Sequence, residues 1–153
     1  MTSDTPRPAT LTELAVRAAN GSGEDRELDA EIAVAVDGGE IMWKTSNGTM
    51  ERYPVRRYAS EMHIGGFASA PVPAFTTSVD AVLSIMPEGT FWQVGNDGVG
   101  PDPSRFAGRV GVPEAEGPYL TFRGAVSPDA PRALLSALLF ALAEIGRVKG
   151  EGK

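Results

Sequence analysis

The chain has 153 residues, of which 42% are hydrophobic, with a formal net charge of −6 at pH 7 and no cysteine. This length suits one domain with a real core, and no stretch approaches the ~18–20 apolar residues of a membrane span. Without cysteine there is neither a disulfide framework nor a thiolate metal site. The acidic balance argues against nucleic-acid binding, which needs a basic surface, and the polar N-terminus lacks the features of a signal peptide, so we expect a cytoplasmic protein.

Two helices are expected in the first 40 residues. After residues 1–9, which we expect to be flexible, Thr10-Leu11-Thr12-Glu13 has the form of a capping box, and Asn20-Gly21 ends the helix that it opens. A second helix starts within residues 22–25 and ends at Gly38-Gly39. Five acids occupy its first turns, which we interpret as a solvated helix start whose charges complement the helix dipole. The alternative is a metal or acid/base pair formed by Asp25 and Asp29, one turn apart.

Short strands follow from Glu40. Residues 40–44 and 50–53 flank an Asn-Gly pair, a strong hairpin signal, and Pro54 is expected to end or edge the second strand. Arginines then alternate with aromatic residues through residues 52–58. This pattern suits a phosphate-bearing or planar ligand, because guanidinium groups bind anions in a bidentate fork and rings offer a π face. The candidate ligand-binding residues are Arg52, Arg56, Arg57 and Tyr58, with an ordinary solvated loop as the alternative.

Catalytic machinery is not indicated. His63 is the only histidine, so sites with two or three histidines are excluded, and no nucleophile motif accompanies it. We expect no metal, no cofactor and no catalytic residue. A small hydrolase that uses Asp25, Asp29 or His63 remains the alternative. Residues 65–74 are expected to form a loop.

The best-defined unit covers residues 76–95. Thr77 and Asp80 form a plausible capping box for a short amphipathic helix, which Pro87 ends. Residues 90–94 then have the β-branched and aromatic content of a strand, in which we expect Trp92 to be a core or sheet residue. Turn residues 96–98 and two further expected strands, 105–112 and 119–125, follow.

A long helix is expected to close the domain. It starts near Ser127, and its leucine-rich stripe spans only about 140° of the helical wheel, which makes it a principal source of stability. Phe140 lies on the opposite face, among Arg132, Ser136, Glu144 and Arg147. An aromatic residue in a polar face suggests contact with another subunit or a partner.

Three segments together resemble the phage ABA-sandwich domain family of small bacteriophage or prophage proteins: the acidic helix start at 25–33, the segment 73–81 with its continuation 87–92, and the closing helix. The resemblance implies an α+β fold, a three-layer α/β/α sandwich with helices on both faces of a mostly antiparallel sheet. It makes Asp29, Asp80, Pro87 and Trp92 fold markers and implies no catalytic residue. Residues 105–125 depart from the family by being longer and richer in glycine and proline.

These observations lead to one preferred expectation about function. A single domain at residues 10–147, followed by a flexible tail at 148–153, is expected to be a non-enzymatic phage accessory protein in the host cytoplasm. It would bind or sequester a small anionic, nucleotide-like ligand or a host factor, and it would be oligomeric. The alternative is an adaptor that inhibits a host protein through its acidic N-terminal helix or the face around Phe140.

Overall fold

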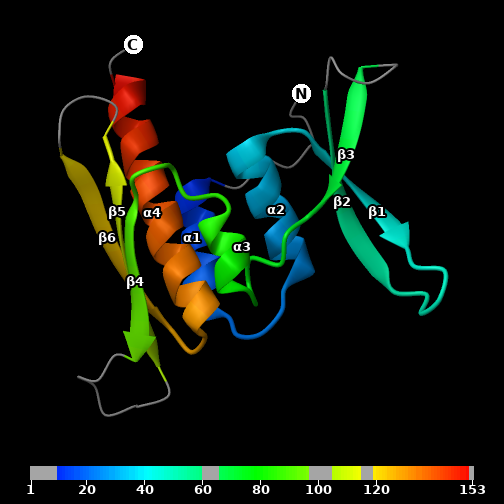
Figure 1. Cartoon of the computed structure of the whole chain (residues 1–153), viewed down its shortest axis with the longest axis horizontal. Coiled ribbons are helices and arrows are strands. Elements are labelled where there is room, and N and C mark those ends of the chain that lie inside the picture. The colour runs from blue at the N-terminus through cyan, green and yellow to red at the C-terminus, as the bar shows by residue number, and fades with distance from the viewer. Residues whose placement is uncertain (1–9, 60–65, 97–104, 115–118, 152–153) are drawn as a thin grey trace, which may run out of the picture.

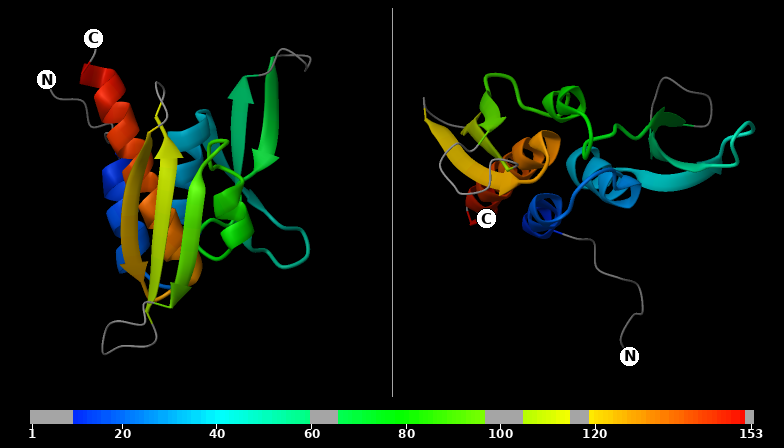
Figure 2. Two further views of the ribbon diagram at one scale, coloured as in Figure 1. Left: turned by 60° about the vertical axis from the view of Figure 1, so that its left-hand side comes forward. Right: turned by 90° about the horizontal axis from the view of Figure 1, so that it is seen from below.

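Two small antiparallel sheets lie on opposite sides of a central group of helices in the computed structural model of the chain (Figure 1). The structure describes residues 10–59, 66–96, 105–114 and 119–151, with residues 147–151 described by their backbone alone. Sheet A contains β1, β2 and β3, and sheet B contains β4, β5 and β6. The view from below in Figure 2 shows the order of the layers as sheet, helices, sheet.

The first helix begins at the predicted cap, and the second begins at the end of the predicted start region, residues 22–25. The Thr10 side chain accepts a hydrogen bond from the Glu13 amide at the start of α1 (Leu11–Asn20), and the Asp25 side chain accepts one from the Leu28 amide at the start of α2 (Arg26–Asp37). Gly38, with φ of 78°, ends α2 in a conformation that suits glycine. Because these signals are local, the sequence was sufficient to predict both helices.

Sheet A is formed by β1 (Glu40–Thr45), β2 (Arg52–Ala59) and β3 (Phe67–Pro71), with β2 in the centre. The expectation that Pro54 ends or edges the second strand was wrong, because β2 continues through it to Ala59. The Pro54 carbonyl accepts a hydrogen bond from the Val72 amide, so an N–H at residue 54 would donate to the Val72 carbonyl, but proline has no N–H. The Val72 carbonyl instead accepts a hydrogen bond from Arg26 Nη2 at 2.7 Å, so Arg26 supplies the donor that proline lacks.

The expected loop at residues 65–74 was also wrong in part, because β3 lies within it. Its sequence Phe-Ala-Ser-Ala-Pro has little strand propensity, and the pairing with β2 supplies the order that the local sequence does not. The arginine-rich segment is therefore the central strand of a sheet and not a solvated loop.

The unit at residues 76–95 has the predicted order of helix, stop and strand. However, α3 (Val79–Leu83) has only five residues, and its cap is Ser78, whose hydroxyl accepts from the Ala81 amide at 3.1 Å, instead of Thr77. Trp92 lies in the strand β4 (Phe91–Asn96), as expected, but its side chain is 42% exposed and does not belong to the core.

Sheet B continues with β5 (Phe106–Pro113) and β6 (Leu120–Ser127), close to the predicted strands. The last helix, α4 (Ala130–Glu151), crosses its inner face and runs beyond the predicted domain end at residue 147. Close approach requires Gly108, because a Cβ atom there would lie 2.6 Å from the backbone of Ala133 in α4.

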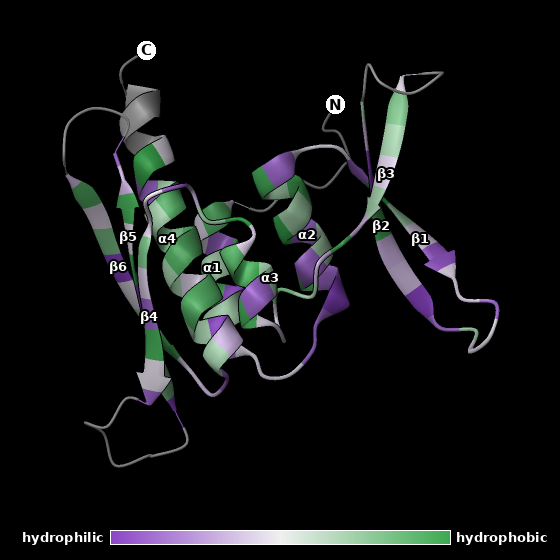
Figure 3. Ribbon diagram, viewed as in Figure 1, coloured by the Kyte–Doolittle hydropathy of each residue, from purple (hydrophilic) through white to green (hydrophobic). Residues whose placement is uncertain are grey.

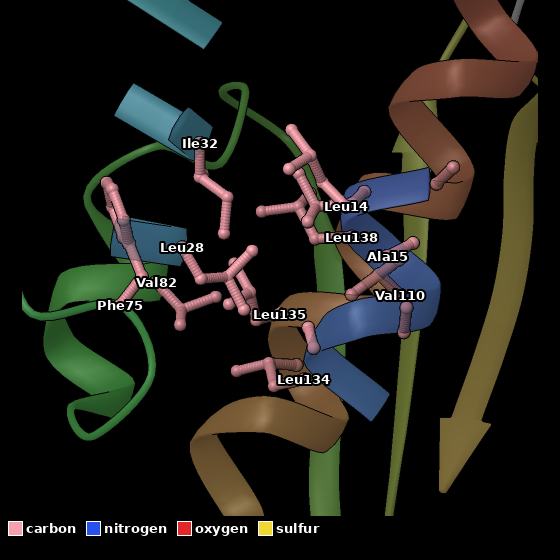
Figure 4. Close-up of a cluster of buried hydrophobic side chains, with 14 of the residues drawn as sticks. Leu14, Ala15, Leu28, Ile32, Phe75, Val82, Val110, Leu134, Leu135 and Leu138 are labelled. Atoms are coloured by element: carbon pink, nitrogen blue, oxygen red, sulfur yellow. The ribbon is translucent and has the colours of Figure 1, made fainter. Parts of the chain in front are cut away.

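The hydrophobic core lies between sheet B and the helices. Figure 4 shows side chains from α1, α2, α3, α4 and β5 meeting there, and the predicted leucine stripe of α4 is fully buried at Leu134, Leu135, Leu138 and Leu139. Sheet A contributes little to this cluster. Figure 3 shows the hydrophobic residues gathered along the central helices and hydrophilic residues toward the free ends of β1 and β2.

The α+β class and the antiparallel strands are confirmed. The single sheet covered by helices on both faces is not what the structure shows, because the strands divide into two separate sheets with the helices between them. Within the described residues, no helix is both long enough and apolar enough to span a membrane.

Candidate functional site

The four candidate ligand-binding residues all lie on β2, but on two faces of sheet A. Side chains of a strand alternate between faces, so Arg52, Arg56 and Tyr58 share one face and Arg57 lies on the other. The first face is directed toward α2, since Arg56 Nη1 lies 3.4 Å from the Asp37 carbonyl and 3.3 Å from the Gly38 carbonyl. The residues therefore do not form one four-membered site.

Each of the three arginines is stacked on an aromatic ring. The guanidinium carbon lies 5.3 Å from the ring centre in the pair Arg52–Trp43 and 4.4 Å in Arg56–Tyr58. In the third pair, Arg57–Phe67, it lies 4.1 Å from the ring centre. A guanidinium that stacks on a ring keeps its N–H edge free for anions and has fewer rotamers to lose on binding. The predicted interleaving thus serves to position the cations.

Arg52 and Arg56 differ in what else they contact. Arg56 donates to the last carbonyls of α2, where a positive charge complements the negative end of the helix dipole, so it has a structural role. Among the described residues, no acceptor or carboxylate pairs with the Arg52 guanidinium. Arg52 is therefore the arginine of this face that is most available to a ligand.

A cleft of about 520 Å³ lies beside these arginines, between α2 and β1, and its size falls in the range of small-molecule sites. Its apolar wall contains an aromatic ring and several small or aliphatic side chains, and its polar wall contains one arginine and two glutamates. The lining residues are Arg17, Glu27, Ala30, Glu31, Val34, Ala35, Ile41 and Trp43.

The cleft exists because α2 presents small side chains to sheet A. Leu28, Ile32 and Ala33 point into the central core, whereas the side facing β1 carries Ala30 and Ala35, which cannot fill the space over Ile41 and Trp43. Trp43 is 36% exposed at the resulting opening.

The polar wall of the cleft is partly neutralised. Arg17 Nη1 and Glu31 Oε2 form an ion pair at 2.6 Å, at a surface where such pairs contribute little to stability. Glu27 lies one turn before Glu31 on α2, and none of the described residues pairs with its carboxylate. The cleft therefore offers an aromatic wall, one unpaired carboxylate and, next to the same tryptophan, the cation of Arg52.

Asp25 and Asp29 are structural residues and not a metal or acid/base pair. Asp25 is the cap of α2, whereas Asp29 is fully buried, where its Oδ1 accepts from the Thr76 amide at 2.9 Å and its Oδ2 from Arg26 at 2.7 Å. Burial raises the pKa of the Asp29 carboxyl, and the bonds to Thr76 and Arg26 oppose that rise. The interpretation of this helix start as entirely solvated was wrong at Asp29.

Sequence reasoning could have found the burial of Asp29. On the helical wheel its side chain lies between those of Ile32 and Ala33, inside the apolar stripe. The same holds for Arg132, which lies beside Leu135 and Ser136 on α4. Both residues are buried because a partner on a distant segment accepts or donates their hydrogen bonds.

The polar face expected around Phe140 is largely buried. Arg132 is 2% exposed and Ser136 is fully buried, where its hydroxyl donates to the Ala15 carbonyl at 2.7 Å. Phe140 itself is half-buried and packs against the core cluster. Its role as an interface residue stays a prediction, as does the use of the acidic N-terminal helix.

Trp43 and Arg17 are site residues that the sequence analysis did not select. A two-residue turn at Asn47-Gly48 would pair Trp43 with Arg52, whereas the observed register pairs it with Pro54. Both registers put Trp43 on the face of Arg52 and Arg56, so the hairpin signal could have placed it there. The position of Arg17 depends on how α1 and α2 pack, for which there is no local signal.

No cluster of three or more histidine, cysteine, aspartate or glutamate side chains suited to a metal ion occurs in the described part of the chain. His63 lies outside the described residues. Comparison with protein-family models, with curated proteins and with solved structures finds no match, so the resemblance to the phage ABA-sandwich domain family stays a prediction.

Proposed function

We propose that the protein is a binding module for a small anionic ligand that contains a planar ring, held in the cleft between α2 and β1. One observation carries the proposal: Trp43 lines the cleft and is also the ring on which the Arg52 guanidinium stacks. A planar ring can lie against Trp43 inside the cleft while an anionic group outside it meets Arg52. A nucleotide has this combination of ring and charge.

The other side chains of the cleft fit the same class of ligand. Glu31 is paired with Arg17 and adds little repulsion. The Glu27 carboxylate, which pairs with none of the described residues, is an acceptor for hydroxyl or amino groups of the ligand. Arg56 adds positive potential on the same face. Arg57 is excluded from this site because it lies on the opposite face of sheet A.

Fluorescence of Trp43 tests the proposal directly. The chain has only two tryptophans, so a Trp92→Phe variant reports on Trp43 alone. We expect adenosine and guanosine 5′-diphosphates to quench this fluorescence in a saturable way. Arg52→Ala should weaken binding by about tenfold or more, since a charge-assisted hydrogen bond contributes ~1.5–3 kcal/mol.

Arg57→Ala is the matched control, because it removes an arginine that is stacked in the same way on the other face of the same strand. The affinity of this variant for the nucleotides should stay within about twofold of the parent, because solvent ions screen the charge of Arg57 from a ligand on the opposite face of the sheet. The proposal is wrong if neither nucleotide changes Trp43 fluorescence, or if the two alanine variants lose affinity equally.

A further inference from the structure

The outer face of sheet B has no covering layer in the described structure. We use this name for the side chains of sheet B that point away from α4, which form three rows across the strands. These rows are Phe91, Gly111 and Phe122; Gln93, Arg109 and Gly124; and Gly95, Ala107 and Val126. The inner face of the same sheet is covered mainly by α4, with α1 also in contact with β6 (Figure 2).

Large apolar side chains on this face are exposed to solvent. Phe91 is 48% exposed and Phe122 is 50% exposed, and their ring centres lie 6.2 Å apart at an angle of 56°. The Phe122 ring lies over Gly111, since a Cβ atom added there would approach the ring to 2.6 Å. Val126 adds a third exposed apolar side chain. Such a grouping is more than the scattered exposure that is normal for a monomer.

Among the three rows of described residues, the only formal charge on the outer face is positive. Arg109 lies in the middle strand, beside Gln93, and no carboxylate among the described residues pairs with it. A hollow of about 220 Å³ adjoins it over β4 and β5. Two copies that stacked these faces by two-fold symmetry would bring two arginines together without a carboxylate, so a second copy is disfavoured. The surface instead complements a partner that carries a negative charge.

The width of the sheet matches one helix. Three strands at about 4.8 Å spacing span roughly 10 Å, which is the diameter of an α-helix. Phe122 and Val126 are four residues apart on β6, or about 13 Å at the rise of a strand, and helix positions i and i+8, which share a face, lie about 12 Å apart. Arg109 lies opposite Gly124, midway between these two.

We propose that the outer face of sheet B docks an amphipathic helix of a partner protein, with apolar side chains about two turns apart on Phe122 and Val126 and a carboxylate between them on Arg109. The bound helix would give sheet B a helical layer on both faces. The inference concerns the sheet on the other side of the molecule from the ligand cleft and does not depend on the proposed ligand.

Selection from a phage-displayed library of single-helix peptides tests this docking surface on the full-length protein. We expect enriched sequences to contain an Asp or Glu about four residues after an aromatic or aliphatic residue. Arg109→Glu should weaken the enriched peptide by about tenfold or more in fluorescence anisotropy. A second selection on Arg109→Glu should then enrich Lys or Arg at the same position. Lys44→Glu makes the same change of charge at an exposed position of sheet A, and it should leave the affinity for the enriched peptide within about twofold.

Four results would overturn the inference. The first is that no helical sequence is enriched, and the second is that enriched peptides bind Arg109→Glu as well as the parent. The third is a dimer in analytical ultracentrifugation that Phe122→Asp dissociates, and the fourth is binding of an oligothymidylate through Arg109. The third result would identify a second copy as the occupant, and the fourth a single-stranded nucleic acid.

Discussion

Replacing Arg132 by methionine should destabilise the protein by about 2–4 kcal/mol, because this side chain closes the carboxyl end of another helix. Arg132 lies in the first turn of α4, where a cation opposes the dipole of its own helix, and it is 2% exposed. Its Nη1 donates to the Ala18 carbonyl at 3.1 Å and its Nε to the Gly23 carbonyl at 3.0 Å. These carbonyls belong to the end of α1 and the link to α2, and no other side chain among the described residues donates to them.

The magnitude follows from two opposing terms. Two well-formed charge-assisted hydrogen bonds contribute about 1.5–3 kcal/mol each, and weaker contacts to Arg17 and Ser22 add little at 3.3 and 3.5 Å. Removing a buried cation recovers part of its desolvation free energy, which reduces the net loss. Methionine keeps most of the apolar volume, so the loss reports on the carbonyls and not on a cavity.

Urea unfolding followed by circular dichroism measures the difference, with an unchanged m-value showing that the folded state stays compact. Arg123→Met is the matched control, since Arg123 is 42% exposed and its pair with Glu144 at 3.4 Å is a surface contact worth less than about 1 kcal/mol. A loss for Arg132→Met no larger than that of the control would refute the reasoning.

Three further outcomes are expected. In a double-mutant cycle, Gly21→Ala should destabilise the parent much more than it destabilises the Arg132→Met variant, because the new Cβ would lie 2.5 Å from the Arg132 guanidinium. Equal losses of stability in both backgrounds would contradict this. Gly108→Ala should cost several kcal/mol in urea unfolding by forcing α4 from sheet B, whereas Gly95→Ala, which meets nothing within 4 Å, should be mild. The raised pKa of Asp29 means that the folded state binds its proton more tightly than the unfolded state, so this group favours folding most below pH 3.8 and loses that contribution as pH rises through the folded pKa. Urea midpoints of Asp29→Asn should therefore fall less than those of the parent across this window, and a larger fall would show the opposite sign.

The features that the sequence predicts well are those with local causes. The cap at Thr10, the start of α2 after residues 22–25 and the closing glycine at Gly38 each depend on backbone groups within four residues. The leucine stripe of α4 is likewise a matter of helical spacing. These signals were sufficient to predict the starts of α1 and α2, the end of α2 and the buried side of α4.

Failures occurred where a distant residue decides the outcome. Pro54 stays within a strand because Arg26 donates to the carbonyl that proline leaves unpaired, and β3 exists because β2 pairs with it. Trp92 is exposed because α4 contacts β5 and β6 far more than the edge strand β4, which it leaves partly uncovered. Whether six strands form one sheet or two is decided by the same kind of long-range packing.

The candidate site was predicted in part for the same reason. The sequence shows the interleaving of arginine and aromatic residues, but its continuation as a strand beyond Tyr53 was not predicted. Alternation along β2 separates Arg57 from Arg52, and the register of the hairpin brings Trp43 beside Arg52. The cleft itself was not predictable from the sequence, because it is space that α2 and β1 fail to fill.

Polar contacts help to attach sheet A to the helices, and this difference from sheet B explains why the cleft can persist. Arg26 bonds the Val72 carbonyl directly after β3, the Asp29 carboxylate bonds the Thr76 amide in the segment that follows, and Arg56 of β2 bonds the end of α2. Directional bonds of this kind hold the sheet at a fixed distance from α2 without requiring that the space between them be filled. Sheet B, by contrast, buries Val110 and Val112 against the leucines of α4, where a cavity of similar size would cost several kcal/mol. A binding cleft is therefore compatible with stability beside sheet A and not beneath sheet B, which leaves the outer face as the part of sheet B available to a partner.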